Sequence, residues 1–305
     1  MKPILLKALC VFLALFVFAV MAWGSSSDSE SKPISGSSTS SSSDAGSDSS
    51  QTDSSPKDVS IDEQVLLDRD GVVVTAKSYS KDSIWGDGIK LLVENNTSQN
   101  LTVSCRDLIV NHYMVSELFS CSVAAGKKNN ETLTLSSSDL KEAGIQTVAE
   151  VEVSFHVYDS DSWDTYFDSD SITIKTSEYG NVEYIPNDSG VELFNNGQIR
   201  IVGKYVNEDT FWGTGILLYM ENNSSQKITV QTRNFSVNGF MMTPLFSKTV
   251  CSGRMAMGEI TLLSNEMEEN GIETVEEVEL SFHIYDDKTY NTVVDTDPIT
   301  FTVNP

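Results

Sequence analysis

The densest group of potential metal ligands lies between Asp159 and Ser171, where the sequence is DSDSWDTYFDSDS. Calcium binds six to eight oxygen atoms and favours carboxylates gathered on a bent backbone. The stretch therefore predicts a calcium site, for which the candidate ligands are Asp159, Asp161, Asp164, Asp168 and Asp170. The spacing is not that of an EF-hand, and aspartates between strands also serve as turn formers. Both interpretations stay open at this point.

Aromatic residues give a second candidate site, this one for a glycan or a protein. Trp85 and Trp212 each lie beside two glycines, in WGDGI and WGTGI, and Trp163 aligns with Tyr290. An exposed ring close to Asp and Asn side chains can stack on the apolar face of a pyranose, whereas a buried tryptophan serves packing. Trp85, Trp212, Trp163 and Tyr290 are therefore candidate ligand-binding residues, and for Trp85 and Trp212 the favoured interpretation is packing at one end of the sandwich.

Catalysis has little support. The sequence contains three histidines, and it lacks a phosphate-binding loop, the zinc-protease helix motif and the serine-hydrolase elbow. His156 and His283 recur in VEVSFHVYD and VELSFHIYD, but no nucleophile recurs beside them. We therefore predict that the chain is not an enzyme, has no catalytic residues and needs no cofactor, calcium being the one ion considered.

The cysteines outside the N-terminal apolar segment are Cys105, Cys121 and Cys251, an odd number. A two-residue hairpin turn at Asn111 would place Cys105 opposite Leu118 and leave Cys121 about 10 Å away along the strand. That separation exceeds the limit of about 7 Å between the Cα atoms of a disulfide. This register favours free thiols, and a bulge near residue 106 would change it.

These candidate residues lie in a chain that repeats itself. Lys77 aligns with Lys204 at an offset of 127 residues, and over 100 positions without a gap 44 residues are identical. A unit of this length is a whole domain, because solenoid repeats are about 20–50 residues long. We predict a signal peptide at 1–24, a disordered Ser/Asp-rich linker at 25–60, and two domains at 61–177 and 185–305.

The local patterns indicate strands. In the segment 151–158 apolar residues alternate with polar ones, as expected for a strand with one buried and one exposed face, and 278–285 repeats this pattern. Asn238-Gly239 is a hairpin signal. Short helices are expected at Ser138–Ala143 and Asn265–Asn270, each followed by a glycine. The pattern predicts an all-β fold with two tandem immunoglobulin-like antiparallel β-sandwiches.

A family resemblance rests on five motifs that occur in both units: a WG turn, an ENN bend, an NG- or NH-type hairpin, a GI-x-T-V step and a closing F-H-x-Y-D strand. This pattern resembles tandem telokin-like immunoglobulin domains of unknown function in secreted or surface proteins of Firmicutes. The resemblance covers about residues 61–305 and implies no catalytic residues. The lipid-modified cysteine of many such proteins is missing, because Trp23-Gly24-Ser25 stands in its place.

The N-terminus and the charge indicate export. Lys2 and Lys7 precede an apolar run from Ala8 to Trp23, shorter than the ~20 residues of a spanning helix. A cleaved signal peptide is the first interpretation, and an uncleaved anchor, which would be the one contact with a membrane, is the alternative. The net charge of −24 disfavours nucleic-acid binding.

Together these features predict a non-catalytic, secreted or cell-surface module that binds or displays something through its two domains. The partner would be an unknown protein or a glycan at the cell surface. Two alternatives remain: a purely structural spacer of the cell envelope, or the accessory carbohydrate-binding part of an enzyme system. Screening the protein against glycans would distinguish a binding module from a structural spacer.

Overall fold

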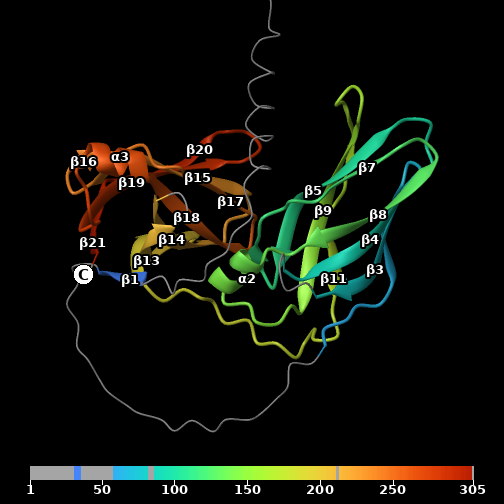
Figure 1. Cartoon of the computed structure of the whole chain (residues 1–305), viewed down its shortest axis with the longest axis horizontal. Coiled ribbons are helices and arrows are strands. Elements are labelled where there is room, and N and C mark those ends of the chain that lie inside the picture. Colours follow the sequence, from blue (N-terminus) through green and yellow to red (C-terminus); the bar gives the residue numbers. More distant parts are fainter. Residues whose placement is uncertain (1–30, 36–57, 82–85, 211–212, 304–305) are drawn as a thin grey trace, which may run out of the picture. The chain divides into compact units, whose positions relative to one another are not determined.

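The computed structural model describes residues 31–35, 58–81, 86–210 and 213–303 (Figure 1). The predicted signal peptide, most of the predicted linker, Trp85 and Trp212 lie outside these residues. The described residues form β-strands and two short helices, so the predicted all-β class is confirmed.

The first repeat is a sandwich of two antiparallel sheets. One sheet has the order β2-β3-β4-β8, and the other has β5 between β7 and β9. Strands β10 and β11 pair with successive parts of β9, and β6 forms a hairpin with β5. The bounds are β2 (Gln64–Arg69), β3 (Val72–Ser80), β4 (Gly88–Asn95), β5 (Leu101–Val110), β6 (Tyr113–Met114), β7 (Ser120–Val123), β8 (Lys127–Thr134), β9 (Glu150–Asp159), β10 (Thr165–Asp168) and β11 (Ile172–Lys175).

The second repeat has the same pairings in the same order. One sheet is β12-β13-β14-β18, and the other has β15 between β17 and β19, with β20 and β21 on β19. The bounds are β12 (Val191–Asn195), β13 (Ile199–Thr210), β14 (Gly213–Asn222), β15 (Ile228–Val237), β16 (Phe240–Met241), β17 (Ser247–Val250), β18 (Arg254–Leu263), β19 (Glu277–Asp286), β20 (Thr292–Asp295) and β21 (Ile299–Val303).

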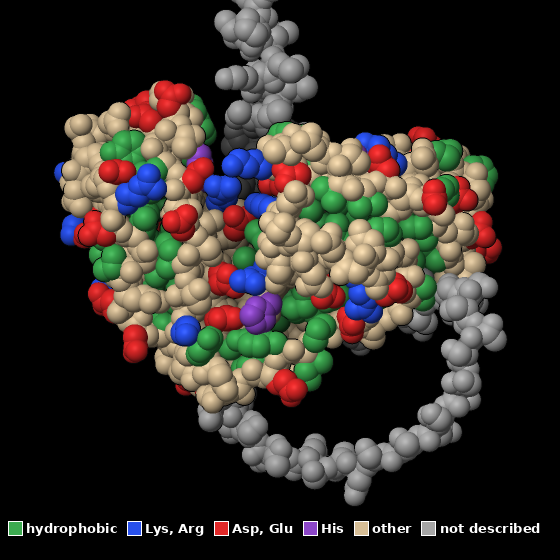
Figure 2. Space-filling view, turned by 180° about the vertical axis from the view of Figure 1, so that it is seen from behind, with side chains coloured by type: hydrophobic (Ala, Val, Ile, Leu, Met, Phe, Trp, Pro, Cys, Tyr) green, Lys and Arg blue, Asp and Glu red, His purple; other side chains and the backbone are tan. Residues whose placement is uncertain are grey.

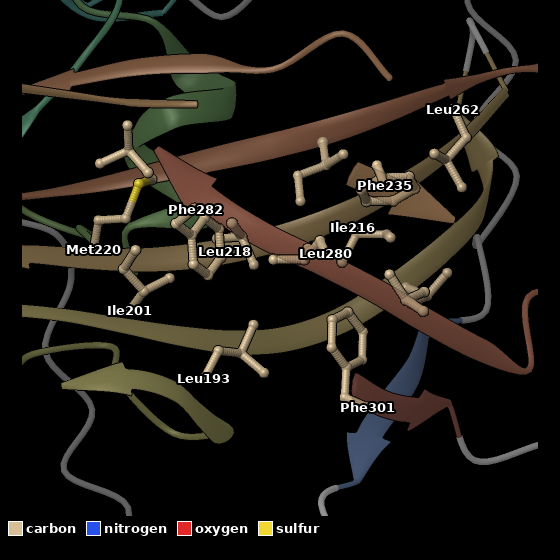
Figure 3. Close-up of a cluster of buried hydrophobic side chains, with 14 of the residues drawn as sticks. Leu193, Ile201, Ile216, Leu218, Met220, Phe235, Leu262, Leu280, Phe282 and Phe301 are labelled. Atoms are coloured by element: carbon tan, nitrogen blue, oxygen red, sulfur yellow. The ribbon is translucent and has the colours of Figure 1, made fainter. Parts of the chain in front are cut away.

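The period of two in the sequence explains why these strands pack as they do. Along β9 every second side chain is fully buried, with Phe155 at the centre, and β19 repeats this with Phe282. Figure 3 shows Leu280 and Phe282 of β19 packed beside Leu218 of the facing sheet. Each repeat therefore buries its own apolar core between its two sheets.

The two helices follow the expected chemistry at their ends. Helix α2 (Ser137–Glu142) begins after Ser136, whose hydroxyl accepts a hydrogen bond from the Asp139 N–H at 3.3 Å. Helix α3 (Ser264–Glu269) has no such side-chain cap. Both helices are confirmed, each beginning and ending one residue earlier than predicted, which is within the usual uncertainty of helix ends.

The ENN motif of each repeat supplies a buried asparagine that fixes a bend. In the second repeat, Asn222 Nδ2 donates to the carbonyls of Gln226 and Val250 at 2.8 and 2.9 Å. Its Oδ1 accepts from the N–H and the hydroxyl of Ser224 at 3.0 and 2.6 Å. Asn95 makes the corresponding four bonds in the first repeat. The motif recurs because the amide satisfies several backbone groups of a buried turn.

The two repeats touch through residues in which they differ. Lys227 Nζ lies 2.5 Å from Asp107 Oδ1, and the aligned positions hold Asn100 and Asn234. Strand β6 pairs in parallel with β18, and an apolar cluster across the contact consists of Tyr113, Ala143, Val202, Leu217, Tyr219 and Met257. The duplicated sequence has thus diverged where one copy packs against the other.

A carboxyl group beside this contact should make stability depend on pH. Burial, followed by the charges of Asp139 and Glu259, raises the pKa of Glu142 to about 7. The pKa of Glu142 is higher in the folded state than in the unfolded state, so the folded state favours the protonated carboxyl. The resulting contribution to stability is fully present below about pH 4.5 and is lost as the pH rises through 7. After allowance for partial exposure, we expect the free energy of unfolding to fall by about 1–2 kcal/mol between pH 4.5 and pH 8 from this group.

Urea unfolding of the native chain and of Glu142→Gln at the two pH values measures the effect. The substitution should abolish that share of the pH dependence. Glu269→Gln is the matched control, since Glu269 is the exposed equivalent of Glu142 in the second repeat. An unchanged pH profile in Glu142→Gln would contradict the assignment.

The predicted linker is not uniform. Residues Ser31–Ser35 form strand β1, which pairs antiparallel with both β13 and β21 of the second repeat (Figure 1). The expectation that 25–60 is without structure is therefore wrong for these five residues. It failed because the segment is surrounded by serines, and because both of its partner strands lie more than 150 residues further along the chain.

Candidate functional site: a duplicated aromatic strip

Of the four predicted aromatic ligand residues, the structure describes Trp163 and Tyr290. Both follow the strand that closes the core of their repeat, and both are among the most exposed large side chains, at 67% and 75%. Single exposed rings are common on protein surfaces. These two differ because each is stacked against further aromatic side chains.

The stack has three rings in each repeat, and we call it the aromatic strip. In the first repeat it consists of His156, Tyr158 and Trp163, with centroid distances of 5.4 Å and 5.5 Å between successive rings. The planes of Tyr158 and Trp163 lie 15° apart, so the two rings are nearly parallel. The result is a stack of three rings that starts on β9, with Trp163 as its outermost and most exposed member.

The second repeat has the same strip, made of His283, Tyr285 and Tyr290. Successive centroids lie 5.4 Å and 6.1 Å apart. Each residue of this strip aligns with one of the first at the offset of 127. Duplication has kept the strip, with the replacement of Trp163 by a smaller ring as its one change.

A tight turn holds the last ring in place. The Asp159 carboxylate accepts hydrogen bonds from the N–H groups of Asp161 and Ser162, at 2.9 and 2.8 Å. The N–H of Trp163 donates to the Asp159 carbonyl at 2.9 Å. These backbone bonds lower the pKa of Asp159. The turn forces Trp163 to φ +66° and its equivalent Tyr290 to φ +59°.

That backbone conformation is unusual for an aromatic residue. Glycine and asparagine adopt the left-handed region readily, while bulky side chains are strained there by about 1–3 kcal/mol. Both repeats nevertheless place a large, exposed ring at this position. A residue that is strained and mostly exposed contributes little to packing, which points to a role outside the fold.

A histidine–aspartate hydrogen bond fixes the first ring. His156 Nδ1 lies 2.6 Å from Asp168 Oδ1, and Arg106 bonds the same carboxylate at 3.1 Å. In the second repeat His283 Nδ1 lies 2.6 Å from Asp295, to which Arg233 is bonded at 3.2 Å. With Nδ1 engaged by the carboxylate, the imidazole is held in one orientation beside the tyrosine.

This pair has the form of a catalytic histidine and its orienting acid, but the neighbouring strand supplies no shared nucleophile. Ser104 is the residue opposite His156 on β5, and its hydroxyl donates to the His156 carbonyl at 3.1 Å. The corresponding residue opposite His283 is Gln231. The arrangement that both repeats share is therefore an oriented ring and not a nucleophile with its base.

Three of the five aspartates predicted as calcium ligands bind different partners. Asp159 caps the turn, Asp161 accepts from Asn100 at 3.2 Å, and Asp168 holds His156. Among the described residues, the group of three His, Cys, Asp or Glu side chains that could share a metal ion is elsewhere. It consists of His112, Glu150 and Glu152, whose ligand atoms lie within 4.8 Å of one another. Asp164 and Asp170 belong to no such group either, and calcium binding at this loop stays a prediction.

The group of His112, Glu150 and Glu152 already has a cationic partner. Arg254 Nη2 lies 2.8 Å from Glu152 Oε2, and His112 Nε2 lies 3.5 Å from Glu150 Oε1. The group lies at the contact between the repeats, where the Met255 N–H donates to the His112 carbonyl at 3.0 Å. Its residues are thus part of that contact.

The three described cysteines are free. The predicted register was wrong in detail, because Cys121 pairs with Val103 and the Cys105 N–H donates to the Phe119 carbonyl. Burial raises the pKa of Cys105 to about 12 and that of Cys121 to about 11. Both thiols are therefore protonated and poor nucleophiles at neutral pH.

Sequence reasoning found the outermost ring of each strip and missed the inner tyrosine and the arginine. The alternation along the strand predicts Tyr158 as one of several exposed positions, and the sequence marks Arg106 as the place of a bulge and not as a site residue. A signal was present, because Tyr158, Arg106 and Asp168 are all identical in the second repeat. Identity at exposed positions of two copies, where packing does not require it, would have pointed to all three.

Acidic side chains are scattered over the face shown in Figure 2, with basic ones among them singly or in small groups. Among the described residues, none of the helices is long and apolar enough to cross a membrane.

Comparison with known proteins adds little. No family model matches the chain, and no curated protein matches it. One similar solved structure is the Salmonella enterica SafA pilin in complex with the SafB chaperone, at 13% identity over 70% of this chain and 88% of that chain. Its TM-score is 0.18, which is too low to say anything of what the present chain binds.

Proposed function

We propose that the chain is an exported, non-catalytic module that binds carbohydrate at the cell surface through its two aromatic strips. The observation that carries this proposal is the exposed ring of Trp163, which projects from a strained backbone and stacks on Tyr158, together with its copy in the second repeat. The predicted signal peptide and the lack of a recurring nucleophile agree with it.

The chemistry of the strip fits a sugar ring. A pyranose presents one face of C–H groups, which packs on the flat face of an aromatic ring, and hydroxyls at its rim, which need polar partners. Beside the outer ring lie Asp161 and Asp164, both exposed and on the same turn. In the second repeat Lys288 and Asn291 replace them, so we expect the two strips to prefer different sugars or to differ in affinity.

Binding should depend on the outer rings. Isothermal titration with a panel of soluble cell-wall and plant polysaccharides should identify a ligand, and that ligand should quench the fluorescence of Trp163. We expect Trp163→Ala to weaken binding to the first repeat about tenfold, and Trp163→Ala with Tyr290→Ala to abolish it. Phe240→Ala is the control, since Phe240 is an aromatic residue 47% exposed that lies outside both strips.

A second substitution distinguishes function from packing. Because glycine relieves the strained backbone, Trp163→Gly should leave the melting temperature unchanged or raise it, while binding to the first repeat weakens as much as in Trp163→Ala. A structural ring would show the opposite, with a clear loss of stability. If no polysaccharide in the panel binds, or if binding is the same in the double variant, the proposal fails and a spacer role gains support.

A further inference from the structure

Strand β1 fills a gap in the second repeat. Lys32 and Pro33 lie opposite Val206 and Tyr205 of β13, and the next two residues lie opposite Val303 and Thr302 of β21. Since β13 and β21 belong to different sheets of the sandwich, β1 passes from one sheet to the other and joins their edges. In Figure 3 the strand, in blue, runs beside Phe301 of the core.

The first repeat closes the same gap with residues that directly precede its own first strand. The Ser177 N–H donates to the Ser60 carbonyl at 2.8 Å, and the Ser60 N–H donates to Ser177 Oγ at 3.1 Å. This places Ile61 opposite Thr176, the residue that aligns with Val303. Ile34 lies opposite Val303, so Ile34 and Ile61 occupy corresponding positions, and Ile61 packs against the core of its repeat.

The second repeat has no local segment left for this purpose. The residues that precede its first strand by the same distance run to the contact with the first repeat. There, the Asn187 N–H donates to Tyr113 Oη at 2.7 Å, and Asn187 Nδ2 donates to the Glu142 carbonyl at 2.8 Å. Asp188, the position that corresponds to Ile61, is bonded to Arg200 at 2.6 Å. The connector between the repeats thus cannot also serve as the closing strand.

From this we infer that the groove between β13 and β21 is an acceptor site for an extended strand, and that Ser31–Ser35 of a second copy of the chain can fill it in place of the chain's own. The ligand class is an extended segment that pairs through its backbone, as in other cases of strand addition. The exchange costs little in contacts, because the same strand enters the same groove in either arrangement. It goes beyond the proposed sugar binding and does not depend on it.

Concentration decides between the two arrangements. Residues 36–57 connect β1 to the first repeat, and a connection of this length keeps the chain's own strand at an effective concentration of about 1 mM. In dilute solution the chain should therefore close on itself. Where copies stand close together, as on a surface, their local concentration reaches that range and strands are exchanged.

Cysteine pairs report which strand is in the groove. In a full chain carrying Cys10→Ser and Cys251→Ala, Ser35→Cys with Thr302→Cys places two thiols at paired positions, within disulfide reach. The control is Ser31→Cys with Thr302→Cys, which lies four residues out of register, on the order of 13 Å away. At 1 μM we expect the first pair to form an intrachain disulfide at least tenfold faster than the control.

The second arm tests exchange. A chain with Ser35→Cys alone and a chain with Thr302→Cys alone are unfolded, mixed, refolded together at 1 μM or 1 mM, and oxidised. We expect the mixed disulfide dimer at 1 mM and at least tenfold less of it at 1 μM. Equal intrachain rates for the in-register and control pairs would overturn the acceptor site. Intrachain bridging without any mixed dimer at 1 mM would overturn the exchange.

Discussion

Phe282→Ala is expected to lower the free energy of unfolding by about 3–5 kcal/mol, and Phe155→Ala should do the same in the first repeat. Both rings are fully buried at the centre of their cores. Removing either loses the transfer free energy of a phenyl group and leaves a cavity that the two rigid sheets cannot close by moving together. Urea denaturation followed by circular dichroism measures the change.

The control for this pair is Phe240→Ala, because the side chain of Phe240 is 47% exposed and contributes little to either core. We expect its effect to stay within about 0.5 kcal/mol. A loss below about 1.5 kcal/mol in either buried variant would show that the two sheets do not pack on these rings as described. Similar losses in both repeats would show that the duplicated cores are also energetically alike.

Asn222→Ala should cost about 2–4 kcal/mol, although the residue is polar and short. The amide of Asn222 is fully buried and bonds the Gln226 and Val250 carbonyls and the Ser224 N–H. Alanine cannot replace these bonds, and each buried group left without a partner destabilises the fold by about 1–3 kcal/mol. Partial entry of water explains why the expected total is less than the sum.

The neighbouring residue provides the control for this experiment. Asn223 is exposed, and Asn223→Ala should change the free energy of unfolding by less than about 0.5 kcal/mol. Thermal and urea unfolding of both variants measure the difference. If the two substitutions lower the free energy of unfolding equally, the hydrogen bonds of the buried amide do not explain why the ENN motif recurs.

Much of the fold could be predicted because its signals are local or duplicated. The alternation along 151–158 predicts a strand with one buried face, and the structure buries Val151, Val153, Phe155 and Val157. The second copy of the same pattern then indicates the second sandwich. The helix at Ser137–Glu142 was predictable for the same reason, since its start at Ser136 and its end before Gly144 depend on a few adjacent residues.

The parts that could not be predicted depend on distant partners. Nothing in the segment SKPIS marks it as a strand, because what makes it one is the pair of open edges on β13 and β21. The aspartates from Asp159 onward suggested a shared ion, yet the turn directs Asp159 to backbone N–H groups and Asp168 to a histidine. The amino-acid composition shows which side chains could bind a metal ion, but the path of the backbone determines which of them lie close together.

Strand β1 also decides how the molecule would respond to a mechanical pull. The chain ahead of Ser31 leads directly into β1, so tension applied from that side reaches the second repeat before it reaches the first. While β1 stays paired, this tension is carried by its pairing with β13 and β21. When β1 detaches, the distance between Ser35 and the first repeat can increase to the contour length of the intervening chain, at most about 75 Å. A sudden pull would therefore break the five-residue pairing of β1 first, and the two β-sandwiches would be stretched only afterwards.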